Sequence, residues 1–260
     1  MTFGEQIAEA RRAQKMTQSA LAELLGVSPE TVSKWERDTY SPSPERLPAL
    51  YQVLKLPYLE NEEAEALYNE QHMSAFIKGR ISGRDFPETQ KALPFAKQAH
   101  AGQFRKASGK VPYINHPLTM VCHALAMGIE DDVLLAALLL HNVPEDCGTA
   151  PDTLPVSEPV REIVRLVTKT GKSPKAYYAG IAKNPMACLV KCIDRCNNLS
   201  SMALGFEQEK IREYVHETEA YYPPLLQMLK GTPAYNNASW LLDYQIRALL
   251  RTAKRISSST

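Results

Sequence analysis

Apolar residues recur at intervals of three and four positions along nearly the whole 260-residue chain. This spacing places them on one face of an α-helix, whereas a half-buried strand would need alternation at every second position. The sequence shows neither that alternation nor a hairpin signal. We therefore predict an all-α protein.

Two helical blocks of different character divide the sequence. Residues 1–60 predict short helices, in which Ser28 and Ser43 are N-caps followed by Pro29 and Pro44. Residues 61–86 are polar and contain two glycines, so we assign them to an interdomain connection. Longer helices follow over residues 87–230. Residues 231–260 predict one more amphipathic helix and a tail, which either pack on the body or pair two chains.

Composition excludes several classes of protein. A formal net charge of +1 and 44% hydrophobic residues fit a globular protein without an overall attraction to nucleic acid or membrane. Five cysteines without paired zinc spacing fit a reducing compartment. The longest apolar run, residues 133–140, is too short to cross a bilayer, and the first residues lack a signal core. We expect a cytoplasmic protein with no membrane partner.

The segment "MTQSALAELLGVSPETVSKWERD" predicts two short helices joined by a tight turn at Gly26. In a helix-turn-helix, the second helix enters the major groove of DNA and the start of the first helix anchors a phosphate. The expected anchor is Gln18. The residues expected at base edges are Ser28, Glu30, Thr31, Ser33 and Lys34.

This segment resembles the helix-turn-helix of phage Cro and repressor proteins, also called the xenobiotic-response-element type. The residues in register with that family are Gln18, Leu21, Ala22, Gly26, Val27, Val32, Trp35 and Glu36. Asp38 stands where the family usually has glycine, but aspartate also adopts the left-handed conformation of a helix end. The resemblance implies binding to a double-stranded DNA operator.

The charges of residues 1–60 leave open a small helical domain used only for protein contacts. Seven basic side chains accompany eight acidic ones, so this block carries a net charge of −1. Because phosphate neutralisation supplies much of the affinity for DNA, one copy would bind weakly. We therefore expect a homodimer that binds two half-sites.

Residue types in the second block predict a metal site. His116, His141 and Asp194 come from separate predicted helices. Imidazole nitrogens and carboxylate oxygens suit a divalent transition metal such as Mn, Fe or Zn. Asn198 follows Asp194 by four positions and so shares its helix face.

Four motifs, "GQFRK", "PYINHP", "LLH-x-x-x-ED" and "K-x-x-D-R-x-x-N", follow one another within residues 87–230. In this order they resemble the HD superfamily of metal-dependent phosphohydrolases, in particular the hydrolase domain of the RelA/SpoT stringent-response enzymes and the small alarmone hydrolases. The resemblance implies an all-helical HD domain that binds Mn²⁺ and removes the 3′-pyrophosphate of the alarmones ppGpp and pppGpp.

The resemblance also implies a role for each matching residue. The implied metal ligands are His116, His141, residue 142 and Asp194. The residues implied to position and activate the attacking water are Glu145 and Asp146. Those implied to contact the nucleotide are Arg105, Lys106 and Asn198. Physically, a metal lowers the pKa of water, a carboxylate takes up a proton, and cations neutralise phosphates.

Asn142 departs from the family, which has aspartate at this position. The asparagine carbonyl can still reach a metal, but without a negative charge, so metal affinity and water activation should both fall. Asn142 is compatible with residual activity, with a nucleotide sensor, or with an engineered inactivation. We rank first a DNA-binding regulator with weakened or disabled alarmone hydrolysis. The alternatives are a non-catalytic nucleotide-sensing repressor and a hydrolase of another nucleotide such as NADPH.

Overall fold

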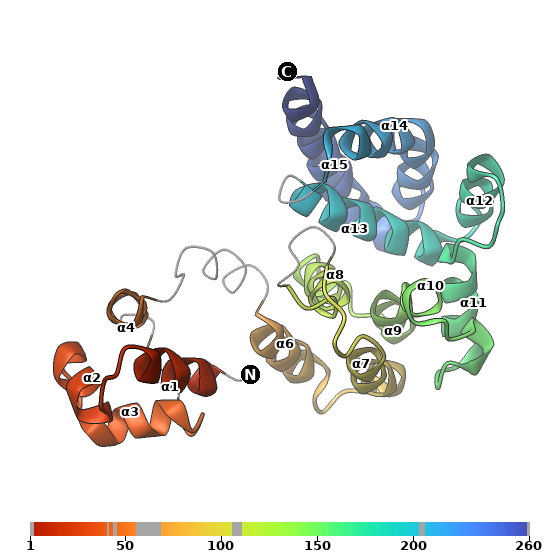
Figure 1. The fold of residues 1–260 in the computed structure, drawn as a ribbon. Helices are drawn as coiled ribbons and strands as arrows, with labels where there is room; N and C mark the ends of the chain where they lie inside the picture. The colour runs from red at the N-terminus through yellow and green to blue at the C-terminus, as the bar shows by residue number, and fades with distance from the viewer. Residues whose placement is uncertain are drawn as a thin grey trace. The chain divides into compact units, whose positions relative to one another are not determined.

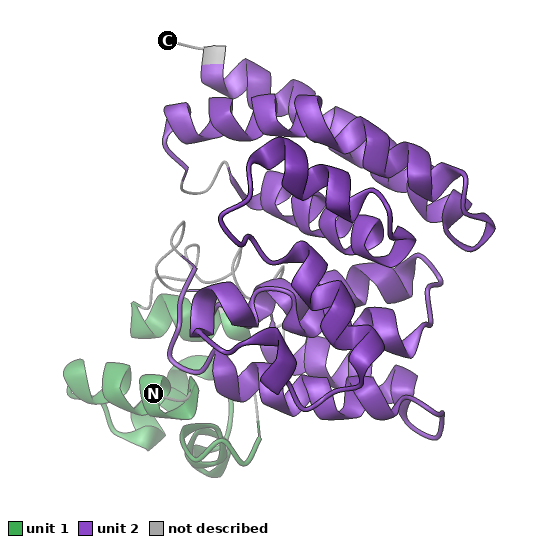
Figure 2. Cartoon of the chain, turned by 90° about the vertical axis from the view of Figure 1, so that its right-hand side faces the viewer, with its two compact units in different colours: residues 1–67 green, residues 68–260 purple. Residues whose placement is uncertain are grey.

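The computed structural model describes residues 3–40, 42–43, 46–55, 69–105, 111–202 and 206–258. These residues form helices and no β-strand, apart from an isolated bridge between Phe104 and Pro112 (Figure 1). The predicted all-α fold is confirmed. None of the described helices combines the length and apolar character that crossing a membrane requires. The chain divides into two compact units, residues 1–67 and residues 68–260 (Figure 2).

The first unit contains α1 (Phe3–Ala13), α2 (Gln18–Leu25), α3 (Pro29–Glu36) and α4 (Leu47–Leu54). The side chains of Thr17 and Ser28 accept hydrogen bonds from backbone N–H groups at the starts of α2 and α3. Gly26, with φ of 62°, ends α2 and permits the tight turn into α3. The unit's core consists of Ile7, Leu21, Ala22, Leu25, Val32, Trp35, Leu50 and Leu54.

A close backbone contact joins the start of α1 to the end of α3. Asp38 has a left-handed φ of 53°, and its Oδ1 accepts a hydrogen bond from the Gly4 N–H at 2.8 Å. A Cβ atom at Gly4 would lie 2.4 Å from the carbonyl oxygen of Trp35, so this approach requires glycine. Asp38 therefore adopts the expected left-handed conformation just after α3, and it also stabilises the packing of α1 against α3.

The second unit is built around one apolar helix. Its helices are α6 (Glu70–Ile81), α7 (Pro87–Ala99), α8 (Asn115–Ala126), α9 (Asp132–Leu140), α10 (Val143–Cys147), α11 (Glu158–Val167), α12 (Pro174–Ile181), α13 (Pro185–Ser201), α14 (Gln208–Lys230) and α15 (Asn236–Ser258). Residues 134–140 of α9 are all buried leucines and alanines, and α9 packs against α7, α8 and α11. A helix that is apolar on every side needs such neighbours. The residue after it, His141, is therefore carried into the core.

Helix α13 separates two layers of the second unit (Figure 1). It packs against α8, α9 and α11 on one side and against α14 and α15 on the other. The long helices α14 and α15 lie side by side, although α14 contains Pro223 and Pro224. This arrangement places the middle of α13 beside the ends of α8 and α9.

One segment differs from the expected domain boundaries, and another takes one of its two expected arrangements. Residues 61–86 are expected to be a connection, but residues 70–81 form α6, which packs on α8 and buries Ile77 and Ile81. These isoleucines lie four positions apart and so share one helix face. Residues 231–260 contain α15, which packs on α13 and α14 within the second unit. The division between the units lies at residue 67, and residues 56–68 are outside the described ranges.

Candidate active site

The three candidate metal ligands come from three helices. His116 lies in the first turn of α8, His141 directly follows α9, and Asp194 lies in the middle of α13. All three are buried, and one potential ligand atom of each lies within 4.8 Å of the others. Asp194 Oδ1 is 3.2 Å from His116 Nε2 and 3.9 Å from His141 Nε2. Packing of α8, α9 and α13 around one core therefore brings these side chains together.

Hydrogen bonds at Nδ1 set the tautomer of both imidazoles. His116 Nδ1 lies 2.5 Å from Asn197 Oδ1, an oxygen that also accepts from Arg105. His141 Nδ1 lies 2.8 Å from the Leu138 carbonyl oxygen. Because an oxygen acceptor requires the proton on Nδ1, Nε2 carries a lone pair in both rings. Both Nε2 atoms are buried without a hydrogen-bond partner, and together with the nearby carboxylate they fit a divalent cation.

Electrostatics favour the protonation states that bind metals. Burial lowers the pKa of His141 to about 3, because a charged ring would lose its hydration. Burial alone would raise the pKa of Asp194, but the Lys191 ammonium holds it well below its usual range. Lys191 Nζ lies 2.7 Å from Asp194 Oδ2. Neutral imidazoles and an ionised carboxylate are the forms that coordinate a cation.

Asn198 connects Asp194 to the expected nucleotide-binding cation. Its Nδ2 donates to Asp194 Oδ1 at 2.6 Å, and its Oδ1 accepts from Arg105 at 2.9 Å. Asn198 therefore orients the carboxylate and also holds the guanidinium group. Lys106, the other expected cation, lies outside the described residues.

Asn142 takes part in a chain of hydrogen bonds at the start of α10. Its Nδ2 donates to the Tyr113 hydroxyl at 2.6 Å. The Tyr113 hydroxyl is hydrogen-bonded to Asp146, and burial together with this carboxylate raises the pKa of Tyr113. The hydroxyl therefore keeps its proton and donates it to Asp146. The donors run in one direction, from Asn142 through Tyr113 to Asp146, and an ionised aspartate at position 142 could not make the first bond.

A cavity of about 600 Å³ opens beside this chain of hydrogen bonds. Glu145 and Asp146 are exposed, and Glu145 Oε1 accepts a hydrogen bond from the Lys169 backbone N–H at 2.7 Å. The volume suits a small-molecule ligand, and aromatic side chains in the wall offer stacking surfaces for a nucleobase. The residues that line the cavity are Gln103, Phe104, Arg105, Tyr113, Asn142, Glu145, Asp146, Asn198, Phe206 and Tyr214.

Three side chains at the site have no role in the sequence-based prediction. Lys191 pairs with Asp194, and Tyr113 contacts Asn142. The buried His100 ring lies 4.7 Å from the Tyr113 ring. Helical spacing could have indicated the contact of Lys191 with Asp194, because Lys191 lies three positions before Asp194 on the same helix face. The position of His100 depends on how α7 packs, and no motif in the sequence indicates it.

The expected DNA-contacting residues lie at the start of α2 and along α3. The exposed ones are Ser28, Glu30 and Lys34, and the half-buried ones are Gln18, Thr31 and Ser33. Glu30 and Lys34 form an ion pair at 3.0 Å, and Gln18 Nε2 donates to Glu36 at 2.7 Å. This internal bond engages the side-chain amide of Gln18, the residue expected to anchor a phosphate.

Known proteins resemble both parts of the chain. Residues 7–61 match the family described as Helix-turn-helix. The chain is 34% identical over 137 residues to guanosine-3′,5′-bis(diphosphate) 3′-pyrophosphohydrolase MESH1 of Xenopus tropicalis, which covers 47% of this chain and 76% of the relative. The human protein of that name is 31% identical over 147 residues, covering 51% and 81%. A guanosine-3′,5′-bis(diphosphate) 3′-pyrophosphohydrolase of Aquifex aeolicus is 32% identical over 153 residues, covering 55% and 21%.

A solved structure shares the helical fold. It is described as a metazoan ortholog of SpoT that hydrolyzes ppGpp, and it aligns with a TM-score of 0.51 at 24% identity over 64% of this chain and 94% of its own. Together these features define a helical, HD-like fold that follows a helix-turn-helix domain. The chain belongs to the family of guanosine-3′,5′-bis(diphosphate) 3′-pyrophosphohydrolases, which confirms the predicted resemblance. It spans about a fifth of the length of the Aquifex relative.

Proposed function

We propose that this chain hydrolyses the 3′-pyrophosphate of ppGpp and pppGpp with a divalent ion, Mn²⁺, and that Asn142 weakens the turnover. The observation that carries this proposal is the pair of buried, unprotonated Nε2 atoms of His116 and His141 beside the ionised Asp194. The similarity to alarmone hydrolases supports the choice of nucleotide.

The metal ligands in this proposal are His116, His141, Asp194 and the side-chain carbonyl of Asn142. A divalent ion bound there supplies a Lewis acid that lowers the pKa of water. The Nδ2 of Asn142 is engaged with Tyr113, which leaves its carbonyl oxygen as the group able to face a cation. That oxygen belongs to a neutral amide. Metal affinity and turnover should therefore be lower than with aspartate.

The cavity residues bind the nucleotide and handle protons. Glu145 and Asp146 would orient the attacking water and accept its proton. The Tyr113 hydroxyl holds the Asp146 carboxylate in place by donating a hydrogen bond to it. Arg105, together with Lys106, would neutralise the phosphates. Asn198 would keep the Arg105 guanidinium at the cavity.

Pyrophosphate release from ppGpp by the purified full chain tests this proposal. We expect slow, Mn²⁺-dependent release, faster release by Asn142→Asp, and none by His116→Ala. If neither the chain nor Asn142→Asp releases pyrophosphate while both bind ppGpp, the protein is a nucleotide sensor instead. NADPH serves as the comparison substrate, and faster phosphate release from it would contradict the choice of alarmone.

We further propose that the first unit binds a DNA operator as a homodimer and makes the chain a cytoplasmic transcription regulator. The exposed Ser28, Glu30 and Lys34 on α3 and the helix-turn-helix match support this role. Gel-shift selection from random DNA should return a palindromic or repeated site, and recovery of none would contradict the proposal. Operator affinity should change when ppGpp and Mn²⁺ are added. An unchanged affinity would refute coupling between the two units.

A further inference from the structure

The outward face of α15 carries two large aromatic side chains. Trp240 is 73% exposed and Tyr244 is 64% exposed, the highest values among large hydrophobic residues in the described part of the chain. Their rings are stacked, with centroids 6.1 Å apart and an interplanar angle of 6°. Exposed aromatic residues that lie together commonly mark a binding surface. This pair lies one helical turn apart on the same face.

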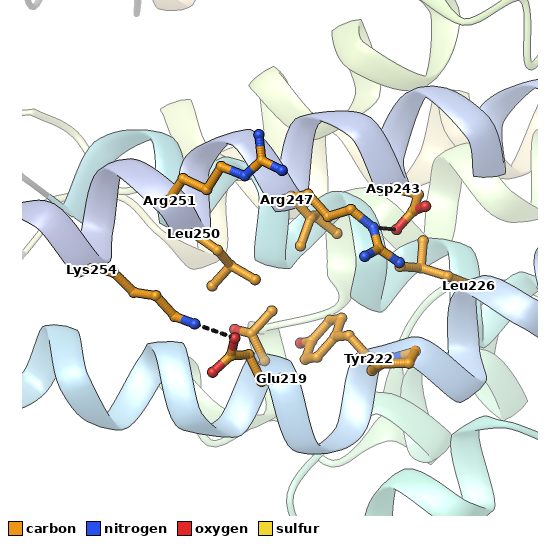
Figure 3. A pocket seen from close by; sticks show the side chains of 11 residues that line it. Glu219, Tyr222, Leu226, Asp243, Arg247, Leu250, Arg251 and Lys254 are labelled. Carbon is orange, nitrogen blue, oxygen red and sulfur yellow. Dashed lines mark hydrogen bonds and ion pairs between the residues drawn. The ribbon is translucent and has the colours of Figure 1, made fainter.

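A hollow lies in the groove between α14 and α15, the helix that carries the aromatic pair. Its volume is about 360 Å³, and its apolar wall includes Tyr222, Leu226 and Leu250. Figure 3 shows charged side chains at the edge, with Lys254 of α15 reaching Glu219 of α14. A second hollow of about 310 Å³ shares Leu226 with the first. The groove is therefore continuous along the two helices and large enough to receive an aromatic ring.

The sequence of α15 is complementary to itself in the antiparallel direction. If two copies of α15 cross a twofold axis at the level of residue 245, positions equally distant from it face each other. Asp243 and Arg247 form an ion pair within each copy at 2.6 Å, and in this arrangement each of these charges also faces its opposite on the second copy. Trp240 faces Leu250 of the second copy, at the wall of the hollow. Charge and shape are thus matched by a single arrangement.

We propose that two copies of this chain pair through α15, with Trp240 of each copy seated in the groove between α14 and α15 of the other. The four aromatic side chains, Trp240 and Tyr244 from each copy, would bury roughly 600–1,000 Å². That is about half of the roughly 1,600 Å² of a typical stable interface, and the flanking helix surfaces supply the rest.

Pairing through α15 explains how residues 1–60, with a net charge of −1, can hold DNA. Two tethered copies meet two half-sites at once, which raises their effective concentration at the operator. The purpose of the dimer rests on the proposed DNA-binding function, but its existence does not. None of the residues of the α15 surface or its groove lines the 600 Å³ cavity of the candidate active site. Each copy would therefore keep its own open site.

Sedimentation equilibrium of the full chain, without DNA or nucleotide, tests the pairing. At micromolar concentrations we expect twice the chain mass of 29.0 kDa. Trp240→Glu should weaken the dimer by on the order of a thousandfold, because a buried aromatic anchor commonly contributes about thirtyfold and the change occurs twice. Phe76→Glu, which alters a 44% exposed aromatic residue on α6, is the matched control and should not weaken it.

A charge exchange tests the antiparallel register. Asp243→Arg and Arg247→Asp should each weaken the dimer, since each places like charges opposite one another. The double variant should restore it. A chain that stays monomeric, a Trp240→Glu variant that still pairs, or a double variant without rescue would overturn the proposal. Pyrophosphate release per chain should be unchanged in Trp240→Glu, so failure of pairing and failure of hydrolysis can be told apart.

Discussion

Replacing Asn142 with aspartate should destabilise the metal-free protein and tighten metal binding. The Tyr113 hydroxyl has one proton, which it donates to Asp146, and it accepts from Asn142 Nδ2 at 2.6 Å. An aspartate at position 142 has no donor, so two carboxylates would compete for one proton. One of them is then left without its hydrogen-bond donor, which should lower the free energy of unfolding by about 2 kcal/mol.

With Mn²⁺ bound, the same carboxylate gains an electrostatic attraction. The ligand atoms of His116, His141 and Asp194 lie within 4.8 Å of one another, so an ion among them would be close to residue 142. One unit of positive charge attracts a carboxylate about 4 Å away by roughly 4 kcal/mol at an effective dielectric constant of about 20. The lost hydrogen bond weakens the folded chain with and without the ion, so it cancels from the binding constant, and Mn²⁺ should bind roughly a thousandfold tighter. In saturating Mn²⁺ the two effects together should leave the variant about 2 kcal/mol more stable than the unchanged chain.

Urea unfolding followed by circular dichroism, first in chelator and then in saturating Mn²⁺, measures both effects. The Asn142→Asp variant should be less stable than the unchanged chain in chelator and more stable in Mn²⁺. Asn184→Asp is the matched control, since it adds the same charge about 15 Å along α13 from Asp194 and keeps a helix cap. If Asn142→Asp loses no stability in chelator and calorimetric titration shows no tighter Mn²⁺ binding, the reasoning is refuted.

Three further outcomes follow from the buried groups. In chelator, lowering the pH from neutral to 5 should lower the free energy of unfolding by about 2 kcal/mol through His141. The pKa of His141 is about 3 in the folded chain and about 6.5 in the unfolded chain, so the unfolded chain takes up the proton first. His141→Asn should show a flatter dependence in urea unfolding. Gly4→Ala should destabilise the first unit by about 1–3 kcal/mol, because the added methyl group would clash with the Trp35 carbonyl oxygen. Trp35 fluorescence measures the unfolding of this unit, and pyrophosphate release should stay unchanged. Lys191→Met should cost about 3–5 kcal/mol in chelator by leaving Asp194 charged and unpaired, and Mn²⁺ should restore most of it. An equal loss with and without Mn²⁺ would contradict the last prediction.

Apolar spacing and capping residues were sufficient to predict the helical class, because most helices have apolar residues at intervals of three and four and a capping residue at one end. The Ser28 cap and the turn at Gly26 are examples in the first unit. Helix α6 is the exception. Its buried residues, Ser74, Ile77 and Ile81, are separated by charged side chains and a glycine, so its place in the fold is set by packing on α8. The sequence of this segment alone resembles a connection.

Residue types and motif order identified the candidate ligands His116, His141 and Asp194, and the structure brings their ligand atoms within 4.8 Å of one another. The hydrogen bond between Asn142 and Tyr113 could not be predicted. It depends on how the turn before α8 meets the start of α10, and this contact joins residues 29 positions apart. Side-chain direction at that point follows from packing of the whole unit.

The partner of Asp194 was also ambiguous from the sequence. Lys191 and Arg195 both lie near it on α13, at three positions before and one position after. The structure pairs Lys191 with Asp194 and directs Arg195 to Glu217 of α14. Positions three apart share a helix face and adjacent positions do not, which favours the lysine once the helix is known.

Because helix α13 lies between two layers, its side chains contact neighbouring helices on both sides. Thirteen of its 17 residues are buried, so almost every substitution must suit two sets of neighbours at once. Cys188, Cys192 and Cys196 recur every fourth position, and Cys196 Sγ lies 3.4 Å from Gln245 Oε1 of α15. Larger side chains in this row would push α15 outward. Among related sequences, α13 should therefore change most slowly, and changes in this row should be matched by changes in α15.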